Sequence, residues 1–286
     1  MLSPAETAQS VSGGLQHKAM MPLISIIFLS IMAGSSIALG DIFWAHSTVG
    51  VAKAAGPGIA NFIGGIAFSV GLMMVVFFGG HLFTSSVLSG VSTYDNKLPI
   101  IKMAWYWVVV WVFNFVGAIL TAYMYYKSEL PLNYDGEILK HFVALGAGKT
   151  SLGFEAAFIR GIFCNVFVCM AIWAATAASD TAGKILAMCF IVGAFVASGY
   201  EHCVANMFIV TEGLFAKAYY LLQVGGDMDA LSQLTHVSVV KLQGLNITNF
   251  FVKNLLPVTL GNICGGLFFV GLIGFMSHKP DMKNTH

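Results

Sequence analysis

Residues 198–206 read Ser-Gly-Tyr-Glu-His-Cys-Val-Ala-Asn and lie inside an apolar stretch that covers residues 184–215. One straight helix over that stretch would be about 48 Å long at about 1.5 Å per residue, whereas the hydrocarbon core of a membrane is about 30 Å thick. Non-helical backbone survives at membrane depth only where protein or a water-filled cavity surrounds it. Because a glycine and then an acid, a histidine and other polar groups interrupt the stretch, we predict a membrane helix that is broken near its middle.

A second stretch of the same kind lies in the first half of the chain. Residues 58–92 are also too many for one span, and they contain the run Gly79-Gly80-His81-Leu82-Phe83-Thr84-Ser85-Ser86. Glycine again comes first and polar side chains follow. We therefore predict a second broken helix here.

The composition places both stretches in a membrane protein. Of the 286 residues, 57% are hydrophobic and 9% are charged, against about 45–50% and 25% in soluble domains. An ordinary soluble enzyme is excluded, and a net charge of +1 without a basic run argues against nucleic acid as a partner. Six stretches have the length and composition of membrane-spanning helices. They are residues 20–44, 58–92, 103–126, 153–178, 184–215 and 250–276.

The two breaks occupy equivalent places in two halves of three spans each. The third and sixth spans also share a pattern, Asn114-Phe115-Val116-Gly117-Ala118 and Asn262-Ile263-Cys264-Gly265-Gly266. An odd number of spans per half forces the halves into opposite orientations, as in the inverted repeats of many channels and transporters. The alternative is that glycines recur because small residues let membrane helices pack closely. We predict an all-α membrane protein of six spans, arranged as an inverted repeat.

Ionisable groups inside a membrane are costly to bury and are candidates for function. His81, Glu201 and His202 lie in the two breaks and are the first candidates. Three further groups lie near the ends of spans, where snorkelling or ion pairing would explain them. These are Asp41, Glu155 and Arg160.

Four segments, in order over nearly the whole chain, resemble the signatures of the formate/nitrite transporter family. They are the stretch from Gly64 to Leu72 with Leu82-Phe83-Thr84-Ser85, the stretch from Cys164 to Trp173, the stretch from Gly199 to Phe208, and the stretch from Asn254 to Asn262. The resemblance implies an aquaporin-like protomer of six helices with its own pore. It also implies a homopentamer and small monovalent anions, namely formate, nitrite or hydrosulfide, as the permeant species.

The resemblance also implies a role for individual residues. His202 would be the central pore histidine, and Thr84 would face it from the broken second span. Lys149 and Asn165 match the lysine and the asparagine that the family has near the fourth span. The apolar constrictions above and below the central chamber would be Phe68, Leu72, Leu82 and Phe195.

Physical chemistry agrees with these roles. Half-helices that begin at mid-membrane point their N-terminal amides at the pore and attract negative charge, and Lys149 can raise the local concentration of anions. Apolar rings nevertheless resist a bare charge. Histidine titrates near physiological pH, so a proton supplied by His202, or passed through it, would neutralise a weak acid for the crossing. The implied function is a membrane channel or transporter for small monovalent anions, either a passive channel or one coupled to protons through His202, since both would use the same residues.

The chain departs from the family at His81, where an acid matching Glu201 is usual. The segment before Asn165 resembles the nitrite and hydrosulfide branches more than the formate branch. The alternative function is an aquaporin-like channel for neutral solutes, which is disfavoured because the chain has no Asn-Pro-Ala motif. We expect neither an enzyme nor a cofactor, because no nucleophile–base pair, His-x-x-His or Cys-x-x-Cys is present.

The lysines orient the chain in the membrane. The positive-inside rule discounts long loops, and the long connections around residues 127–152 and 216–249 carry most of the lysines of one side. We therefore expect both termini in the cytoplasm and the protein in the cell inner membrane, in contact with the lipid bilayer. The expected parts are a cytoplasmic N-terminal segment at 1–19, a six-span channel domain at 20–276 and a cytoplasmic tail at 277–286.

Overall fold

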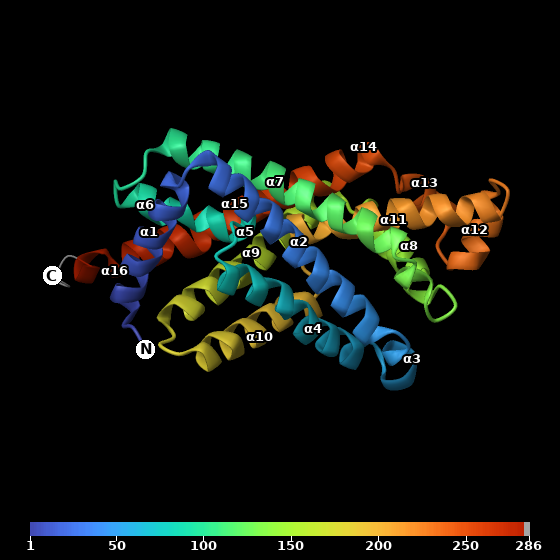
Figure 1. Ribbon diagram of the computed structural model, residues 1–286, viewed down its shortest axis with the longest axis horizontal. Helices are drawn as coiled ribbons and strands as arrows, with labels where there is room; N and C mark the ends of the chain where they lie inside the picture. The colour runs from blue at the N-terminus through green and yellow to red at the C-terminus, as the bar shows by residue number, and fades with distance from the viewer. Residues whose placement is uncertain (283–286) are drawn as a thin grey trace.

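The computed structural model describes residues 1–282, and every regular element in that range is a helix (Figure 1). The elements are α1 (Pro4–Met20), α2 (Leu23–Thr48), α3 (Val51–Ala55), α4 (Pro57–Phe78), α5 (Phe83–Ser86), η1 (Val87–Ser89), α6 (Gly90–Tyr94), α7 (Ile100–Lys127), η2 (Leu130–Leu132), α8 (Glu137–Lys149), α9 (Phe154–Ala177), α10 (Thr181–Ala197), α11 (Cys203–Gln223), α12 (Met228–Thr235), α13 (Val239–Gly244), α14 (Ile247–Asn249), η3 (Phe250–Leu255), α15 (Leu256–Cys264), η4 (Gly265–Leu272) and α16 (Ile273–Met282).

Five helical segments are long and apolar enough to cross a membrane: α2, α4, α7, α9 and the continuous run Ile247–Lys279. They coincide with five of the six predicted spans. Helix α10 is also apolar but shorter, because the fifth predicted span is divided between α10 and α11. The multi-pass membrane protein that the composition predicts is confirmed.

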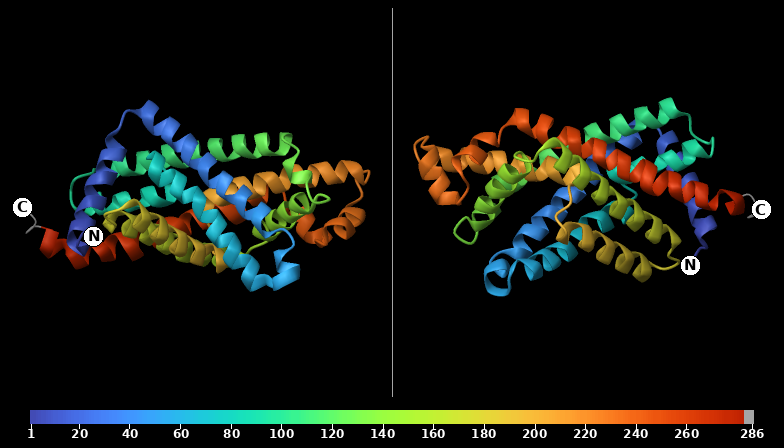
Figure 2. Two further views of the ribbon diagram at one scale, coloured as in Figure 1. Left: turned by 60° about the horizontal axis from the view of Figure 1, so that its bottom comes forward. Right: turned by 180° about the vertical axis from the view of Figure 1, so that it is seen from behind.

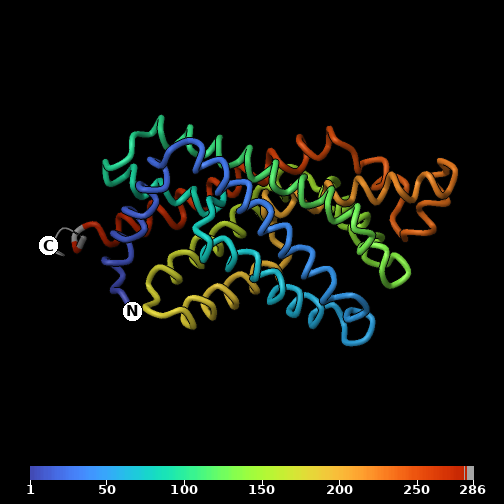
Figure 3. Tube along the Cα trace, viewed as in Figure 1, coloured from blue at the N-terminus to red at the C-terminus, as the bar shows by residue number. Residues whose placement is uncertain are grey.

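Both predicted helix breaks are present. Helix α4 ends at Phe78 and α5 begins at Phe83, while α10 ends at Ala197 and α11 begins at Cys203. Each break opens at a glycine with a left-handed backbone, since φ is 78° at Gly79 and 74° at Gly199, a conformation that side chains with a Cβ disfavour. The tube in Figure 3 passes through both breaks near the middle of the long axis.

The first helix, α1, and the last described helix, α16, lie at one end of the molecule. In Figures 1 and 2, α1, α6 and α16 gather at that end, whereas α3, α12 and α13 lie at the opposite end. The expected N-terminal segment 1–19 is the helix α1, which opens with a capping box between Ser3 and Glu6. It is tied to the body by the Ser92 hydroxyl, which donates to the Ser12 carbonyl at 2.6 Å. Of the expected C-terminal tail, residues 283–286 lie outside the described residues.

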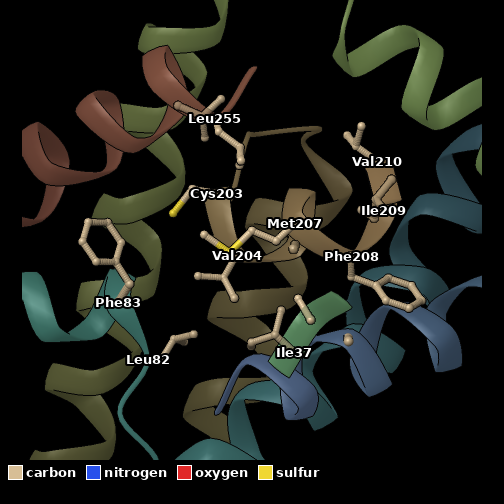
Figure 4. Packing of buried hydrophobic residues seen from close by; sticks show 14 of the residues in the cluster. Ile37, Leu82, Phe83, Cys203, Val204, Met207, Phe208, Ile209, Val210 and Leu255 are labelled. Atoms are coloured by element: carbon tan, nitrogen blue, oxygen red, sulfur yellow. The ribbon is translucent and has the colours of Figure 1, made fainter. Parts of the chain in front are cut away.

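The half-helices that follow the breaks meet in the core. Leu82 and Phe83 at the start of α5 share a buried cluster with Cys203, Val204 and Met207 of α11 (Figure 4). Large apolar side chains also cover much of the outside; examples are Phe28, Trp105 and Phe190. A protein that is apolar both inside and outside is suited to a lipid environment.

Candidate functional site

Two cavities flank the region where the breaks meet. The larger, which we call the α8-side vestibule, has a volume of about 480 Å³ and is lined in part by Phe68, Lys149, Phe195 and His202. The smaller, the α1-side vestibule, has a volume of about 290 Å³. Its lining includes Lys18, Val75, Gly80, Ser85 and Lys184. His202 lines the α8-side vestibule, whereas Ser85, the neighbour of Thr84, lines the α1-side vestibule.

His202 and Thr84 form a hydrogen-bonded pair in that region, as the sequence predicts. The backbone N–H of Ala205 donates to Nδ1 of His202 at 3.0 Å. In the neutral ring the proton is consequently on Nε2, which lies 2.9 Å from the Thr84 hydroxyl oxygen and donates to it. Thr84 thereby keeps its own hydroxyl hydrogen available for another acceptor.

Asn165 binds the backbone of Thr84, whose side chain faces His202. Its side-chain amide donates to the Thr84 carbonyl at 3.1 Å and to the Asn262 carbonyl at 2.6 Å. The predicted asparagine therefore lies beside the Thr84–His202 pair, where it fixes the backbone of α5 against the last span.

Lys149 and Glu201 form a partly buried ion pair at the mouth of the second break. The ammonium lies 3.1 and 3.0 Å from the two carboxylate oxygens, and the side chains are 15% and 5% exposed. Glu201 also accepts from the Asn206 amide at 2.7 Å, which in turn donates to Asn254 at 2.8 Å. The sequence predicts Lys149 as an attractor of anions, but much of its charge is balanced by Glu201.

His81 occupies the matching place in the first break, with different chemistry. Its Nδ1 shares a hydrogen bond of 3.2 Å with the Tyr106 hydroxyl, which lies 3.1 Å from the Ser86 hydroxyl. Its Nε2 is buried without a hydrogen-bond partner among the described residues. The substitution of an acid by histidine therefore removes the carboxylate that Glu201 supplies in the second break.

Phe68 and Phe195 face one another in the α8-side vestibule, with ring centroids 5.8 Å apart at an angle of 87°. Leu72 follows Phe68 by one helical turn on α4 and precedes Val75, which lines the α1-side vestibule. Residues spaced in this way share a helix face. Leu72 and Leu82 are both buried. Of the four predicted constriction residues, Phe68 and Phe195 line the α8-side vestibule, and the constriction role of all four stays a prediction.

Two asparagine side chains anchor the half-helices, a role that the repeated Asn-x-x-Gly pattern did not reveal. Asn114 accepts from the Phe83 backbone N–H at 2.8 Å and donates to the carbonyls of Ser30 and His81. Asn262 accepts from the Cys203 backbone N–H at 2.9 Å and donates to the carbonyls of Gly161 and Glu201. Each amide satisfies one of the unpaired N–H groups with which a helix begins.

The sequence also missed Lys18 and misjudged Asp41. The Lys18 ammonium donates to the Gly80 carbonyl in the first break at 2.9 Å, and its burial lowers the pKa of Lys18 to about 8. Asp41 is 1% exposed, so the prediction that snorkelling or pairing explains it is wrong. Lys18 could have been identified only from the position of α1 against the first break. Asp41 could have been identified only from the position of α2 against α8. Glu155 and Arg160 are exposed, as expected.

Residues 5–276 match the family model described as formate/nitrite transporter. The chain is 35% identical to the formate channel FocA of Haemophilus influenzae, over 95% of this chain and 93% of that one. It is 36% identical to a probable formate transporter of Methanothermobacter thermautotrophicus, over 98% of both. Among solved structures, a pentameric formate channel with formate bound superimposes with a TM-score of 0.76 at 32% identity, covering 90% of this chain and 98% of that chain.

A second solved structure, an FNT family ion channel, superimposes with a TM-score of 0.75 at 26% identity, over 95% of this chain and 98% of that chain. The family-model match over residues 5–276 includes both helix breaks and the residues around them. The chain belongs to the formate/nitrite transporter family, whose members are membrane channels and transporters and not enzymes.

Proposed function

We propose that the chain forms a homopentameric channel for small monovalent anions in the cell inner membrane, with formate as its best-supported substrate. The observation that carries this proposal is the Thr84–His202 pair, which lies between two vestibules that each present a lysine. The relatives named as formate channels support formate. Nitrite and hydrosulfide are the other candidates, since both are small monovalent anions.

We infer that each protomer is a six-span, aquaporin-like inverted repeat. The Asn114 network and the Asn262 network make the same three hydrogen bonds in the two halves. A pair of lysines extends the correspondence, because Lys18 binds at the first break and Lys149 at the second. The first helix and the last described helix, α1 and α16, lie at one end of the molecule (Figure 1), as an even number of crossings requires. We assign that end to the cytoplasm from the lysine distribution, with parts at 1–19, 20–276 and 277–286.

We assign the pentamer from the solved relative whose title describes one. Exposed apolar side chains on α2, α4, α7 and α10 would then contact either lipid or a neighbouring protomer. Each protomer would carry a complete pore, because His202, Thr84 and both vestibules come from one chain.

The hydrogen bonds of Thr84 and His202 suggest how an anion would be conducted. An anion in a vestibule meets the Phe68–Phe195 rings, which exclude water and disfavour a bare charge. The Thr84 hydroxyl hydrogen is free to be donated to the anion, while Nε2 of His202 keeps Thr84 oriented. A proton relay through His202 requires Nδ1 to release the Ala205 N–H and take up a proton as Nε2 gives one away. Neutralising the anion in this way removes the cost of moving its charge through the constriction.

The test is flux into proteoliposomes that contain the purified protein. We expect uptake of radiolabelled formate, and comparable assays with nitrite and hydrosulfide rank the three anions at each of two pH values. Swelling with glycerol is measured on the same vesicles. Rapid glycerol swelling without anion uptake would instead establish the channel for neutral solutes.

A further inference from the structure

Asp41 is a buried carboxyl group in the wall of the α8-side vestibule. It lies on α2, is 1% exposed, and shares the cavity lining with Phe68, Lys149 and His202. Its neighbour Gly40 is in such close contact with the Phe68 backbone carbonyl that even a Cβ at Gly40 would lie 2.8 Å from that oxygen. Asp41 is therefore at the level of the Phe68–Phe195 constriction, beside the path of an anion that enters from this vestibule.

No partner holds Asp41 in an ionised state. Its Oδ2 is buried without a hydrogen-bond partner in the described part of the chain. The three ion pairs found among residues 1–282 do not include it, since Lys149 binds Glu201. An isolated carboxylate in such surroundings is costly, whereas a neutral carboxylic acid is not. Asp41 is consequently a carboxylic acid that faces an anion-conducting cavity.

The other titratable groups of this vestibule are differently engaged. Glu201 in the second break is bound by Lys149 of α8 and by Asn206, so it is a charged acceptor. His202 has Nδ1 occupied by a backbone N–H and Nε2 directed at Thr84. The remaining groups that line the cavity are Arg160 of α9, Tyr200 of the break and Lys241 of α13. Two carboxyl groups line this vestibule among the described residues. Glu201 is bound, whereas Asp41 has neither a hydrogen-bond partner at Oδ2 nor an ion-pair partner.

We propose, resting on the function proposed above, that Asp41 exchanges a proton with the permeant weak-acid anion before it enters the constriction. The O–H bond of Asp41 breaks and an O–H bond to a formate oxygen forms, which leaves the Asp41 carboxylate and neutral formic acid. Lys149 lines the same vestibule as Asp41, and a positive charge nearby favours the ionised form of a carboxyl group while the proton is away. A hydronium ion from the solvent of the vestibule then restores the Asp41 proton. For formic acid that leaves through the α8-side vestibule, the same proton-transfer steps run in reverse.

The test compares Asp41→Asn, which has no acidic proton, with Asp41→Glu, which keeps one. Formate influx and the accompanying proton uptake are measured in proteoliposomes as the external pH is varied. Glu155→Gln is the matched control, since it removes an exposed carboxyl near a span end. We expect Asp41→Asn to lose influx by at least about tenfold, in line with the usual effect of a positioned acid, and to flatten the pH profile. Asp41→Glu should restore both.

The outcomes separate this inference from the proposed function. If the wild type carries no anion, the proposed function fails. If the wild type carries formate and Asp41→Asn keeps its rate and its pH profile, the role of Asp41 is overturned while the channel stands. If Asp41→Asn assembles poorly, infrared difference spectroscopy provides a second test. The wild type should show the C=O band of a protonated carboxylic acid, and this band should shift in Asp41→Glu. A wild type without that band would also overturn the proposal.

Discussion

A single backbone amide decides which nitrogen of His202 carries its proton. Because the Ala205 N–H donates to Nδ1, the neutral ring has Nε2–H and can serve Thr84 only as a donor. The histidine is thus both the cap of α11 and the partner of Thr84. Its two roles can be separated by a side chain that makes both hydrogen bonds without titrating.

Asparagine is such a side chain, because its carbonyl accepts and its NH₂ group donates. We expect His202→Asn to fold and assemble as the wild type does, but to change the dependence of flux on pH. His202→Ala, which makes neither hydrogen bond, is the control for structure. Flux through both variants between about pH 5 and 8, the range in which histidine titrates, is the measurement. A wild-type pH profile in His202→Asn would remove the proton-relay role.

The Lys149–Glu201 ion pair leads to a second prediction, which concerns thermal stability. Removal of one member of a buried ion pair leaves an uncompensated charge and costs about 3–5 kcal/mol. We expect Lys149→Met to lower the thermal unfolding temperature in detergent for this reason. The double variant Lys149→Met, Glu201→Gln should recover most of the loss, because no charge is left behind. Equal unfolding temperatures for Lys149→Met and the wild type would show that solvent screens the pair.

The broken helices depend on side chains from other spans. A helix that begins in the middle of a membrane exposes N–H groups that water cannot satisfy, and Asn114 and Asn262 supply the acceptors. Each amide also donates twice, once to the loop of the break and once to another span. Two spans and one half-helix are thereby fixed to one side chain in each half.

Loss of this anchor should be costly in either half. Asn262→Ala leaves the Cys203 N–H and the Glu201 carbonyl without the partners that the amide supplies, and each buried unsatisfied group costs about 1–3 kcal/mol. We expect the variant to unfold at a clearly lower temperature than Asn246→Ala, which changes a half-buried asparagine that caps the three-residue helix α14. Unfolding followed by circular dichroism distinguishes the two. Similar temperatures would mean that other contacts hold α11.

The sequence predicts much of this arrangement, but only where the signal is local. Gly79 and Gly199, each followed by polar residues in an overlong apolar run, locate both breaks correctly. The pairing of Lys149 with Glu201, and the contact of Lys18 with Gly80, join residues far apart in the chain and depend on which helices are adjacent. The burial of Asp41 cannot be predicted for the same reason. Its position near a span end does not reveal that it lines one cavity together with residues of α8.

At the scale of the whole molecule, the two ends are built from different helices. One end carries α1 and α16, and the other end carries α12 and α13 (Figure 1). If the molecule spans the membrane along this direction, the two ends face different compartments. Gly13 and Gln233 are exposed residues at the respective ends, and a side chain at Gly13 meets nothing within 4 Å.

Gly13→Cys and Gln233→Cys should therefore react with a membrane-impermeant thiol reagent from opposite sides of inner-membrane vesicles. In right-side-out vesicles we expect Gln233→Cys to be labelled and Gly13→Cys to be protected until the membrane is permeabilised. The unmodified chain controls for its five native cysteines. Labelling of both variants from the same side contradicts an even number of crossings with both termini inside the cell.

The two lysines that bind at the helix breaks have unequal partners, and this difference should make the current depend on its direction. Lys149 faces a carboxylate, but Lys18 faces only a carbonyl, while further cationic side chains line both vestibules, Lys184 on the α1 side and Arg160 with Lys241 on the α8 side. A pore with fixed positive charge at one mouth gathers anions there and passes more current from that side. The asymmetry should weaken as pH rises through about 8, where Lys18 loses its charge, and His81→Glu should abolish it by giving Lys18 a carboxylate. Current–voltage curves in symmetric formate solutions would reveal both effects.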